Sequence, residues 1–232
     1  MHLYIDQELK GAKTDKQITA AIERGFDRCE KEWLEMAKLA FPLGYPKTAY
    51  VGACALVAIV HDEKLFIANA GDCKGVLLSK NDAGDLTAKK LSTTFNANKD
   101  YEQERLKNEH PGEADIFHCY SKESCYVKGG LQPTRSFGDL RIKHAEFNNH
   151  YKPPGEGYRK PIPNFKGPYV SHKPDIKVFE LGKDDQWLVL ASDGLWDHLG
   201  REESAAIATK GLKDDLKKKQ SNANQVLMAL MN

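Results

Sequence analysis

Residues 187–197 read Trp-Leu-Val-Leu-Ala-Ser-Asp-Gly-Leu-Trp-Asp, an apolar strand that runs into Asp193 and Gly194 and continues to Asp197. A strand terminus fixes a carboxylate and leaves it open to water, and oxygen atoms are the ligands that Mg²⁺ and Mn²⁺ prefer. Gly194 lets the backbone turn directly after the strand. The segment therefore makes Asp193 a candidate ligand for a divalent cation. Taken alone, however, it favours a plain turn, because Asp-Gly commonly follows a strand.

Two further segments place Gly-Asp after an apolar element. One is Ala68–Gly75, which contains Asp72, and the other is Gly130–Asp139, which ends in Gly138 and Asp139. In the second segment Arg135 lies four residues before Asp139. Its guanidinium matches the geometry of either a phosphate or a carboxylate, so Arg135 is interpreted as a phosphate ligand or as half of a structural salt bridge, with the salt bridge favoured.

Together these segments resemble the motifs of the metal-dependent protein phosphatases of the 2C type. The segments "IANAGDCKG", "LQPTRSFGD" and "LVLASDGLWDHLG" occur in the order of that family's motifs. The segments "ERLKNEHPGE" and "HKPDIKVFEL", which lie between them, support the resemblance. "LQPTRSFGD" and the long insert after it are similar to the pyruvate dehydrogenase phosphatase branch. The resemblance extends from about residue 52 to residue 209.

The resemblance implies an α+β fold: an antiparallel β-sandwich flanked by helices on both faces, here as one domain over residues 1–232 that is incomplete at both chain ends. Residues 140–170 correspond to a flap-like insert beside the active site. In the family, a water activated by Mg²⁺ or Mn²⁺ attacks phosphoserine or phosphothreonine. Two metals would lower the pKa of that water and neutralise the charge of the phosphoryl group.

The implied roles are assigned position by position. Asp193 matches a core metal ligand, and Asp139 and Asp197 match residues that form an additional, weaker metal site with it. Asp72 matches a supporting position, as do Gly194, Gly138 and Arg135. No catalytic residue is identified beyond the metal ligands.

The sequence also departs from the family. The N-terminal Asp-Gly-His-Gly-Gly signature, which supplies a bridging metal ligand, and the final Asp-Asn pair are absent. A lone core aspartate binds Mg²⁺ weakly, so a weak or partial metal site and no turnover by this chain alone are expected. Three explanations stay open: a fragment of a serine/threonine phosphatase, a chain whose sandwich edges another chain or larger assembly completes, or a pseudophosphatase kept as an interaction module.

The periodicity of the chain predicts helices toward both ends and strands in the middle. A capping box at Thr14 opens a helix with an apolar stripe to Met36. Residues 53–60 and 65–70 predict a hairpin buried on both faces, because both runs are nearly all apolar. Further elements are expected at the following residues: strands at 75–79, 87–91, 116–119, 125–127, 176–181 and 187–191, and helices at 2–8, 99–108, 201–209 and 223–231, the last two separated by the charge run 210–219.

Composition narrows the range of partners. The net charge is +1, which gives no general attraction to nucleic acid or to an anionic membrane, so a phosphoprotein substrate must be recognised locally. No apolar run approaches the roughly 20 residues of a membrane span. The five cysteines form no CxxC pair, which favours free thiols and an intracellular, reducing compartment. The cytoplasm is favoured over mitochondria, because no Arg-rich presequence is visible.

Overall fold

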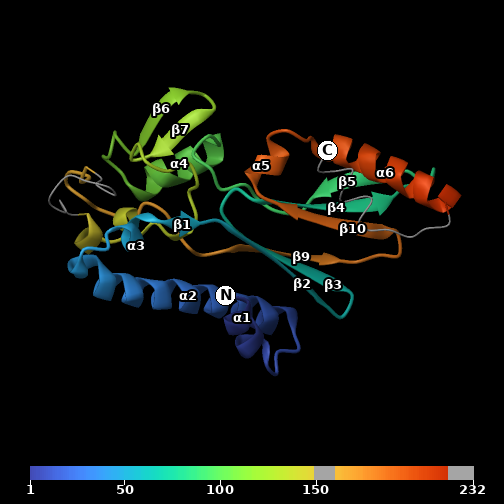
Figure 1. Ribbon diagram of the computed structural model, residues 1–232, viewed down its shortest axis with the longest axis horizontal. Helices are drawn as coiled ribbons and strands as arrows, with labels where there is room; N and C mark the ends of the chain where they lie inside the picture. The colour runs from blue at the N-terminus through green and yellow to red at the C-terminus, as the bar shows by residue number, and fades with distance from the viewer. Residues whose placement is uncertain (149–159, 219–232) are drawn as a thin grey trace. The chain divides into compact units, whose positions relative to one another are not determined.

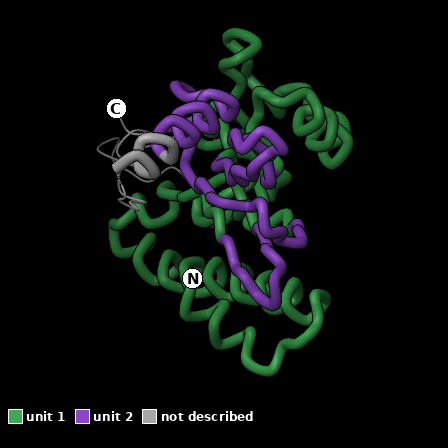
Figure 2. The backbone as a smooth tube through the Cα atoms, turned by 90° about the vertical axis from the view of Figure 1, so that its right-hand side faces the viewer, with its two compact units in different colours: residues 1–57, 68–72, 93–176 green, residues 58–67, 73–92, 177–232 purple. Residues whose placement is uncertain are grey.

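A computed structural model of the protein describes residues 1–148 and 160–218. The chain divides into two compact units, coloured separately in Figure 2. Unit 1 contains residues 1–57, 68–72 and 93–176, and unit 2 contains residues 58–67, 73–92 and 177–232. Each unit is described by itself below.

Unit 1 begins with a helical hairpin (Figure 1). Helix α1 (His2–Leu9) contacts the long helix α2 (Asp15–Ala40). The Thr14 side chain accepts a hydrogen bond from the Gln17 backbone and the Gln17 side chain returns one, which confirms the predicted capping box. Ile18, Ile22 and Phe26 are at most 1% exposed, so the first part of the predicted apolar stripe is buried. The stripe does not stay buried to its predicted end, because Met36 is 44% exposed.

The rest of unit 1 combines short elements around its own apolar core. These are η1 (Phe41–Leu43), α3 (Lys47–Tyr50), β1 (Gly52–Ala53), α4 (Asp100–Glu109), β6 (Phe117–Ser121), β7 (Ser124–Val127), β8 (Phe137–Gly138), η2 (Leu140–Ile142) and η3 (Ala145–Phe147). Strands β6 and β7 pair antiparallel, and so do β1 and β8. The core beneath them includes Leu106, Ile116, Val127 and the fully buried Tyr169.

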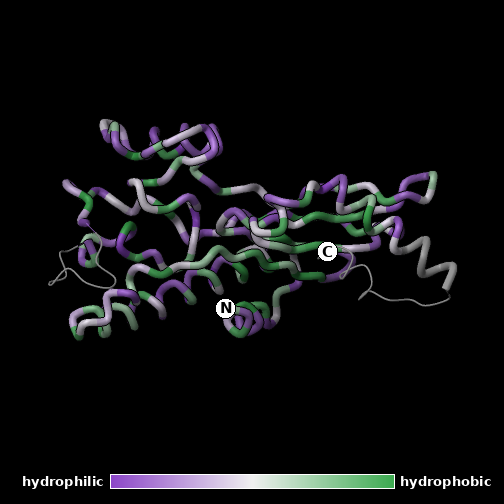
Figure 3. Tube along the Cα trace, turned by 45° about the horizontal axis from the view of Figure 1, so that its top comes forward, coloured by the Kyte–Doolittle hydropathy of each residue, from purple (hydrophilic) through white to green (hydrophobic). Residues whose placement is uncertain are grey.

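Unit 2 contains an antiparallel sheet in the order β10-β4-β5. Its elements are β4 (Lys74–Lys80), β5 (Leu86–Lys90), β10 (Asp185–Ala191), α5 (Asp193–Trp196) and α6 (Arg201–Lys218). Helix α6 lies along this sheet in Figure 1, and Ala205 and Ala208 pack with Val76 and Leu78. The hydrophobic residues that supply this core are drawn in green in Figure 3.

Three strands continue from one unit into the other. They are β2 (Ala55–His61), β3 (Lys64–Ala70) and β9 (Asp175–Glu180), hydrogen-bonded in the order β2-β3-β9. The predicted hairpin is thus confirmed, but only one of its two strands is buried as predicted. Leu65 to Ala70 of β3 are buried, whereas the apolar residues of β2 are half-buried or exposed and Val60 is 65% exposed. β2 is an edge strand in this order and has a neighbour on one side only, so its side chains have fewer residues packed beside them than those of β3.

Helices and antiparallel sheets together confirm the α+β class. One boundary prediction is wrong: α6 runs from Arg201 to Lys218 and therefore continues through most of the charge run that was expected to end it. The helix predicted at 223–231 and part of the flap-like segment at 140–170 lie outside the described residues. No helix within the described ranges has both the length and the apolarity needed to cross a membrane.

The cysteine prediction needs correction. Cys119 and Cys125 form a disulfide, because the antiparallel pairing of β6 with β7 places them directly opposite each other. Cys29, Cys54 and Cys73 are free thiols, each half-buried. The sequence separation of six gives no CxxC signature, so the pair is visible only once the hairpin register is known.

The disulfide predicts a simple count of thiols. Denatured, unreduced protein should give three reactive thiols per chain, and reduced protein should give five. A thiol titration with a chromogenic aromatic disulfide measures both numbers. Five thiols before reduction would contradict the cross-strand bond.

Candidate functional site

Asp139 comes directly after strand β8 in unit 1, as its sequence motif predicts. The residue has a left-handed backbone (φ 48°), and its N–H donates to the Val51 carbonyl at 2.8 Å. The Ser136 hydroxyl donates to Asp139 Oδ2 at 2.7 Å. Burial raises the pKa of the Asp139 carboxyl above its ordinary value, against the lowering effect of the Ser136 hydrogen bond. The carboxylate therefore lies where its charge is poorly solvated.

A buried ion pair supports this turn from below. Lys143 Nζ lies 2.6 Å from Glu30 Oε1, and the two side chains are only 3% and 6% exposed. Glu30 Oε2 also accepts the Gly138 N–H at 2.9 Å, and Lys143 donates to the Ser136 carbonyl at 2.6 Å. The sequence analysis missed this pair. The available signal was that Glu30 continues the apolar stripe of α2, four residues after Phe26.

Asp72, which the sequence predicts to be a supporting residue near the site, is buried in unit 1. It is 7% exposed, and both of its carboxylate oxygens have partners. The Cys54 thiol donates to Oδ1 at 3.2 Å, and Asn96 Nδ2 donates to Oδ2 at 2.9 Å. All three residues belong to unit 1. These bonds fix the carboxylate within a polar cluster below the surface.

Asp193 and Asp197 lie together at the end of β10 in unit 2, as predicted. Both are exposed, and the Asp197 N–H donates to the Asp193 carbonyl at 2.8 Å, so one helical turn carries both carboxylates. Asp193 Oδ1 accepts the Gly194 N–H at 2.9 Å. Trp196 anchors the turn, since its indole N–H lies 3.1 Å from the carbonyls of Lys74 and Ala191.

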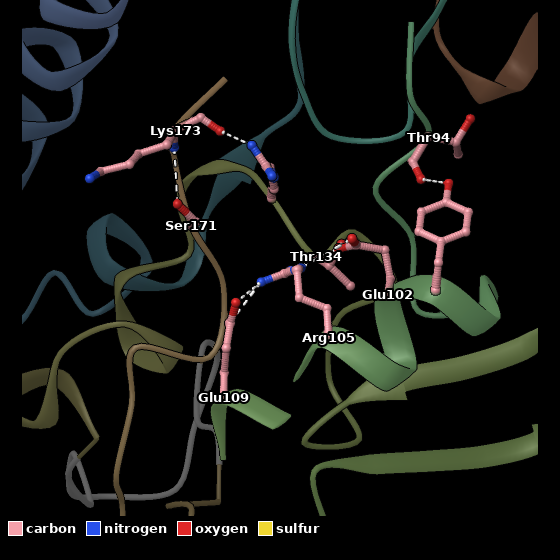
Figure 4. A network of polar contacts seen from close by, with 9 residues as sticks. Thr94, Glu102, Arg105, Glu109, Thr134, Ser171 and Lys173 are labelled. Carbon is pink, nitrogen blue, oxygen red and sulfur yellow. Dashed lines mark hydrogen bonds and ion pairs between the residues drawn. The ribbon is translucent and has the colours of Figure 1, made fainter. Parts of the chain in front are cut away.

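Arg135 does not form the salt bridge that was favoured. Within the described ranges no carboxylate is paired with it. Its Nη1 instead donates to the Lys173 carbonyl at 2.8 Å, and the guanidinium stacks on Phe95 at 3.8 Å from the ring centroid. The nearby carboxylate Glu102 is instead held by Arg105 and by the Thr134 hydroxyl, as Figure 4 shows.

The predicted aspartates are the right kind of ligand for a divalent cation, but too few potential ligands lie together in the described residues. Carboxylate oxygens suit Mg²⁺ and Mn²⁺, whose binding depends on several clustered oxygens. In the part of the chain that is described, however, no three Asp, Glu, His or Cys side chains gather as a metal site would require. Asp139 belongs to unit 1, whereas Asp193 and Asp197 belong to unit 2. No chemical step through a metal follows from these residues alone.

The raised pKa of Asp139 predicts how a neutral substitute behaves. Asp139→Asn should raise the melting temperature at pH 7 in the presence of a chelator, because it removes a poorly solvated charge and keeps an acceptor for Ser136. A carboxyl whose folded pKa is raised favours folding most at low pH and loses that contribution as pH rises. The advantage of Asn should therefore shrink as pH falls toward 4. Thermal denaturation by circular dichroism across this range measures it; a lower melting temperature for the variant at pH 7 would contradict the prediction.

Comparison with known proteins gives one consistent result. Residues 2–231 match the family described as Protein phosphatase 2C. Two relatives from Arabidopsis thaliana are a probable protein phosphatase 2C 48, 39% identical over 80% of this chain and 47% of its own, and a probable protein phosphatase 2C 67, 33% identical over 85% and 51%. A probable protein phosphatase 2C 36 of rice is 38% identical over 85% of this chain and 50% of its own. The chain thus spans about half the length of the curated relatives it matches.

Solved structures agree on the fold. A serine-threonine phosphatase 2C from Toxoplasma gondii superimposes with a TM-score of 0.60 at 15% identity, over 98% of this chain and 68% of that one. A sex determining protein of C. elegans superimposes with a TM-score of 0.65 at 14% identity, over 99% of this chain and 47% of that one. At these identities the likeness concerns the fold alone.

Proposed function

Since the chain belongs to the protein phosphatase 2C family, we propose that its parent protein is a serine/threonine phosphatase that acts on phosphoproteins through a water activated by Mg²⁺ or Mn²⁺. The observation that carries the proposal is the family match over residues 2–231, a range that includes both Gly-Asp segments and the Asp193-Gly194 segment. Bound metal would supply a low-pKa water and charge neutralisation at the phosphoryl group.

The proposed metal ligands are Asp193, Asp139 and Asp197. Two observations support them: Asp139 and Asp193 lie one or two residues after a strand end, and the pair in unit 2 is exposed to solvent, where a cation is free to enter. Asp72, Gly138, Gly194 and Arg135 are proposed as supporting residues. We propose that this chain contributes only part of the metal site and that the chain alone turns over little or no substrate.

A non-catalytic interaction module is the second candidate. It is favoured by the finding that no set of three potential metal ligands gathers in the described residues. The strand order also makes β2 and β10 edge strands among the described elements, and such edges accept a further strand. Another chain, or another part of a larger assembly, is therefore a proposed partner. The affiliation with the pyruvate dehydrogenase phosphatase branch stays a prediction. The cytoplasmic location also stays a prediction, and the Cys119–Cys125 disulfide removes the argument for it that rested on free thiols.

A chimera tests both candidates. The matched part of the Arabidopsis relative that is 39% identical would be replaced by this chain, so that the relative supplies all remaining segments. Phosphate release from a phosphothreonine peptide with millimolar Mn²⁺ is expected for the chimera, to be lost on Asp193→Asn, and not expected for the 232-residue chain. A folded but inactive chimera would overturn the phosphatase proposal and favour the interaction module. Turnover by the chain alone would overturn the partial-site proposal.

A further inference from the structure

Unit 1 contains an open cleft of about 880 Å³ that the proposed metal ligands do not line. Its walls come from α2, from α4 and from the segment 168–174 that precedes β9. A volume of this size accommodates several residues of a bound peptide. The charged side chains that line the cleft are Glu23, Asp27, Glu30, Lys31, Arg105, Glu109, Arg135, Lys143 and Lys173.

Most of the acidic groups in this cleft are already paired. Glu30 holds Lys143 at 2.6 Å, and Glu109 holds Arg105 at 2.7 Å (Figure 4). Asp27 accepts a bond from His172 at 2.8 Å. Glu30 and Glu109 are thus neutralised by cations. Glu23 has no cationic partner within the described ranges, and the partner of Asp27 is a histidine, which counts as neutral at pH 7.

Three cations in the cleft have no ion pair within the described ranges. They are Lys31 on α2, Arg135 before β8 and Lys173 before β9. Against the two remaining carboxylates, Glu23 and Asp27, they leave an excess of about one positive charge. A phosphate monoester carries a charge of about −1.5 to −2 at neutral pH, so this excess would neutralise part of it.

Arg135 is the most specific of the three. Its Nε is buried and has no hydrogen-bond partner among the described residues, while its Nη1 is fixed by the Lys173 carbonyl. Phe95 covers one face of the guanidinium and so holds its plane. Burial, and then the nearby charge of Arg105, lowers the pKa of Arg135. A guanidinium held in this way is preorganised for an oxyanion, which would supply the missing counter-charge.

We propose that this cleft binds the phosphate monoester of a phosphopeptide, with Arg135, Lys173 and Lys31 as its cationic ligands. The phosphate class follows from the unpaired charges. The choice of a peptide as its carrier rests on the proposed function and on the size of the cleft. The binding needs no metal and no turnover, so it is tested separately from the reaction.

Isothermal titration calorimetry of the 232-residue chain at low salt, with a chelator present, tests the proposal. The probes are a phosphothreonine peptide, the same peptide with unmodified threonine, and inorganic phosphate. We expect the phosphothreonine peptide to bind at least tenfold more tightly than either of the others. Arg135→Gln and Lys173→Gln should each weaken its binding by about tenfold, since each removes a charge-assisted hydrogen bond to the phosphate.

Two variants secure the interpretation. Arg201→Gln removes an exposed guanidinium paired with Glu202 outside the cleft and should leave binding unchanged. Lys173 is exposed and donates through its backbone, so Lys173→Gln stays informative if Arg135→Gln does not fold. Equal binding of both peptides, equal binding of inorganic phosphate, or unchanged affinity in folded Arg135→Gln and Lys173→Gln would each overturn the proposal. If the chimera is active but the 232-residue chain does not bind the phosphothreonine peptide, the cleft proposal fails and the phosphatase proposal stands.

Discussion

Replacing Lys143 by methionine is expected to lower the free energy of unfolding by about 3–5 kcal/mol, the usual cost of breaking a buried ion pair from one side. Among the described residues, the substitution leaves the buried Glu30 carboxylate with the Gly138 N–H as its one remaining partner. It also leaves the Ser136 carbonyl without the bond that Lys143 donates. Urea denaturation followed by circular dichroism measures the change.

Two further variants separate this charge effect from lost packing. Adding Glu30→Gln to Lys143→Met should restore part of the stability, because the amide oxygen still accepts from Gly138 but no unpaired charge is buried. Lys38→Met removes a lysine of the same protein from an exposed pair with Glu35 and should change stability by less than about 1 kcal/mol. If Lys143→Met costs no more than Lys38→Met, the buried pair does not stabilise the turn at Asp139.

Sequence patterns correctly predicted those features whose determinants lie within one short stretch of the chain. The capping box at Thr14 and the apolar stripe from Ile18 to Phe26 are confirmed, because periodicity and capping act within one helix. Glu30 shows the limit of that reasoning. Its partner Lys143 is 113 residues away, so the side chain that neutralises it is found only when the fold is known. The same holds for the pairing of Cys119 with Cys125, which depends on a strand register.

In the candidate site, too, placement along the chain was predictable from sequence, whereas contacts between distant segments were not. Asp72, Asp139 and Asp193 each follow a strand end, as the motifs indicate, because that placement is encoded by an apolar run followed by glycine or serine. Electrostatic environment was not encoded there. Arg135 was expected to meet a carboxylate, but Arg105 and Thr134 already occupy Glu102, so Arg135 bonds a carbonyl instead. Competition among partners from distant segments decided this outcome.

Gly138→Ala is expected to lower the free energy of unfolding by about 3 kcal/mol or more. Gly138 has φ +65°, and a Cβ there would lie 2.4 Å from the Val51 carbonyl oxygen. The left-handed conformation costs alanine about 1–2 kcal/mol, and forcing an atom into a packed site costs about 1–3 kcal/mol more. The obstructing atom belongs to the backbone, so relief requires moving β1 away from β8. The measurement is again urea denaturation.

Gly112→Ala is the matched control for this prediction. Gly112 has φ +84°, but a Cβ there meets nothing within 4 Å, so this variant carries the backbone strain without the clash. A cost of about 1–2 kcal/mol is expected for it. The difference between the two variants therefore measures how tightly β1 approaches the turn that carries Asp139. Equal costs would mean that β1 yields easily. In that case the Gly138 N–H is free to leave Glu30, and the position of Asp139 depends on the buried ion pair rather than on strand pairing.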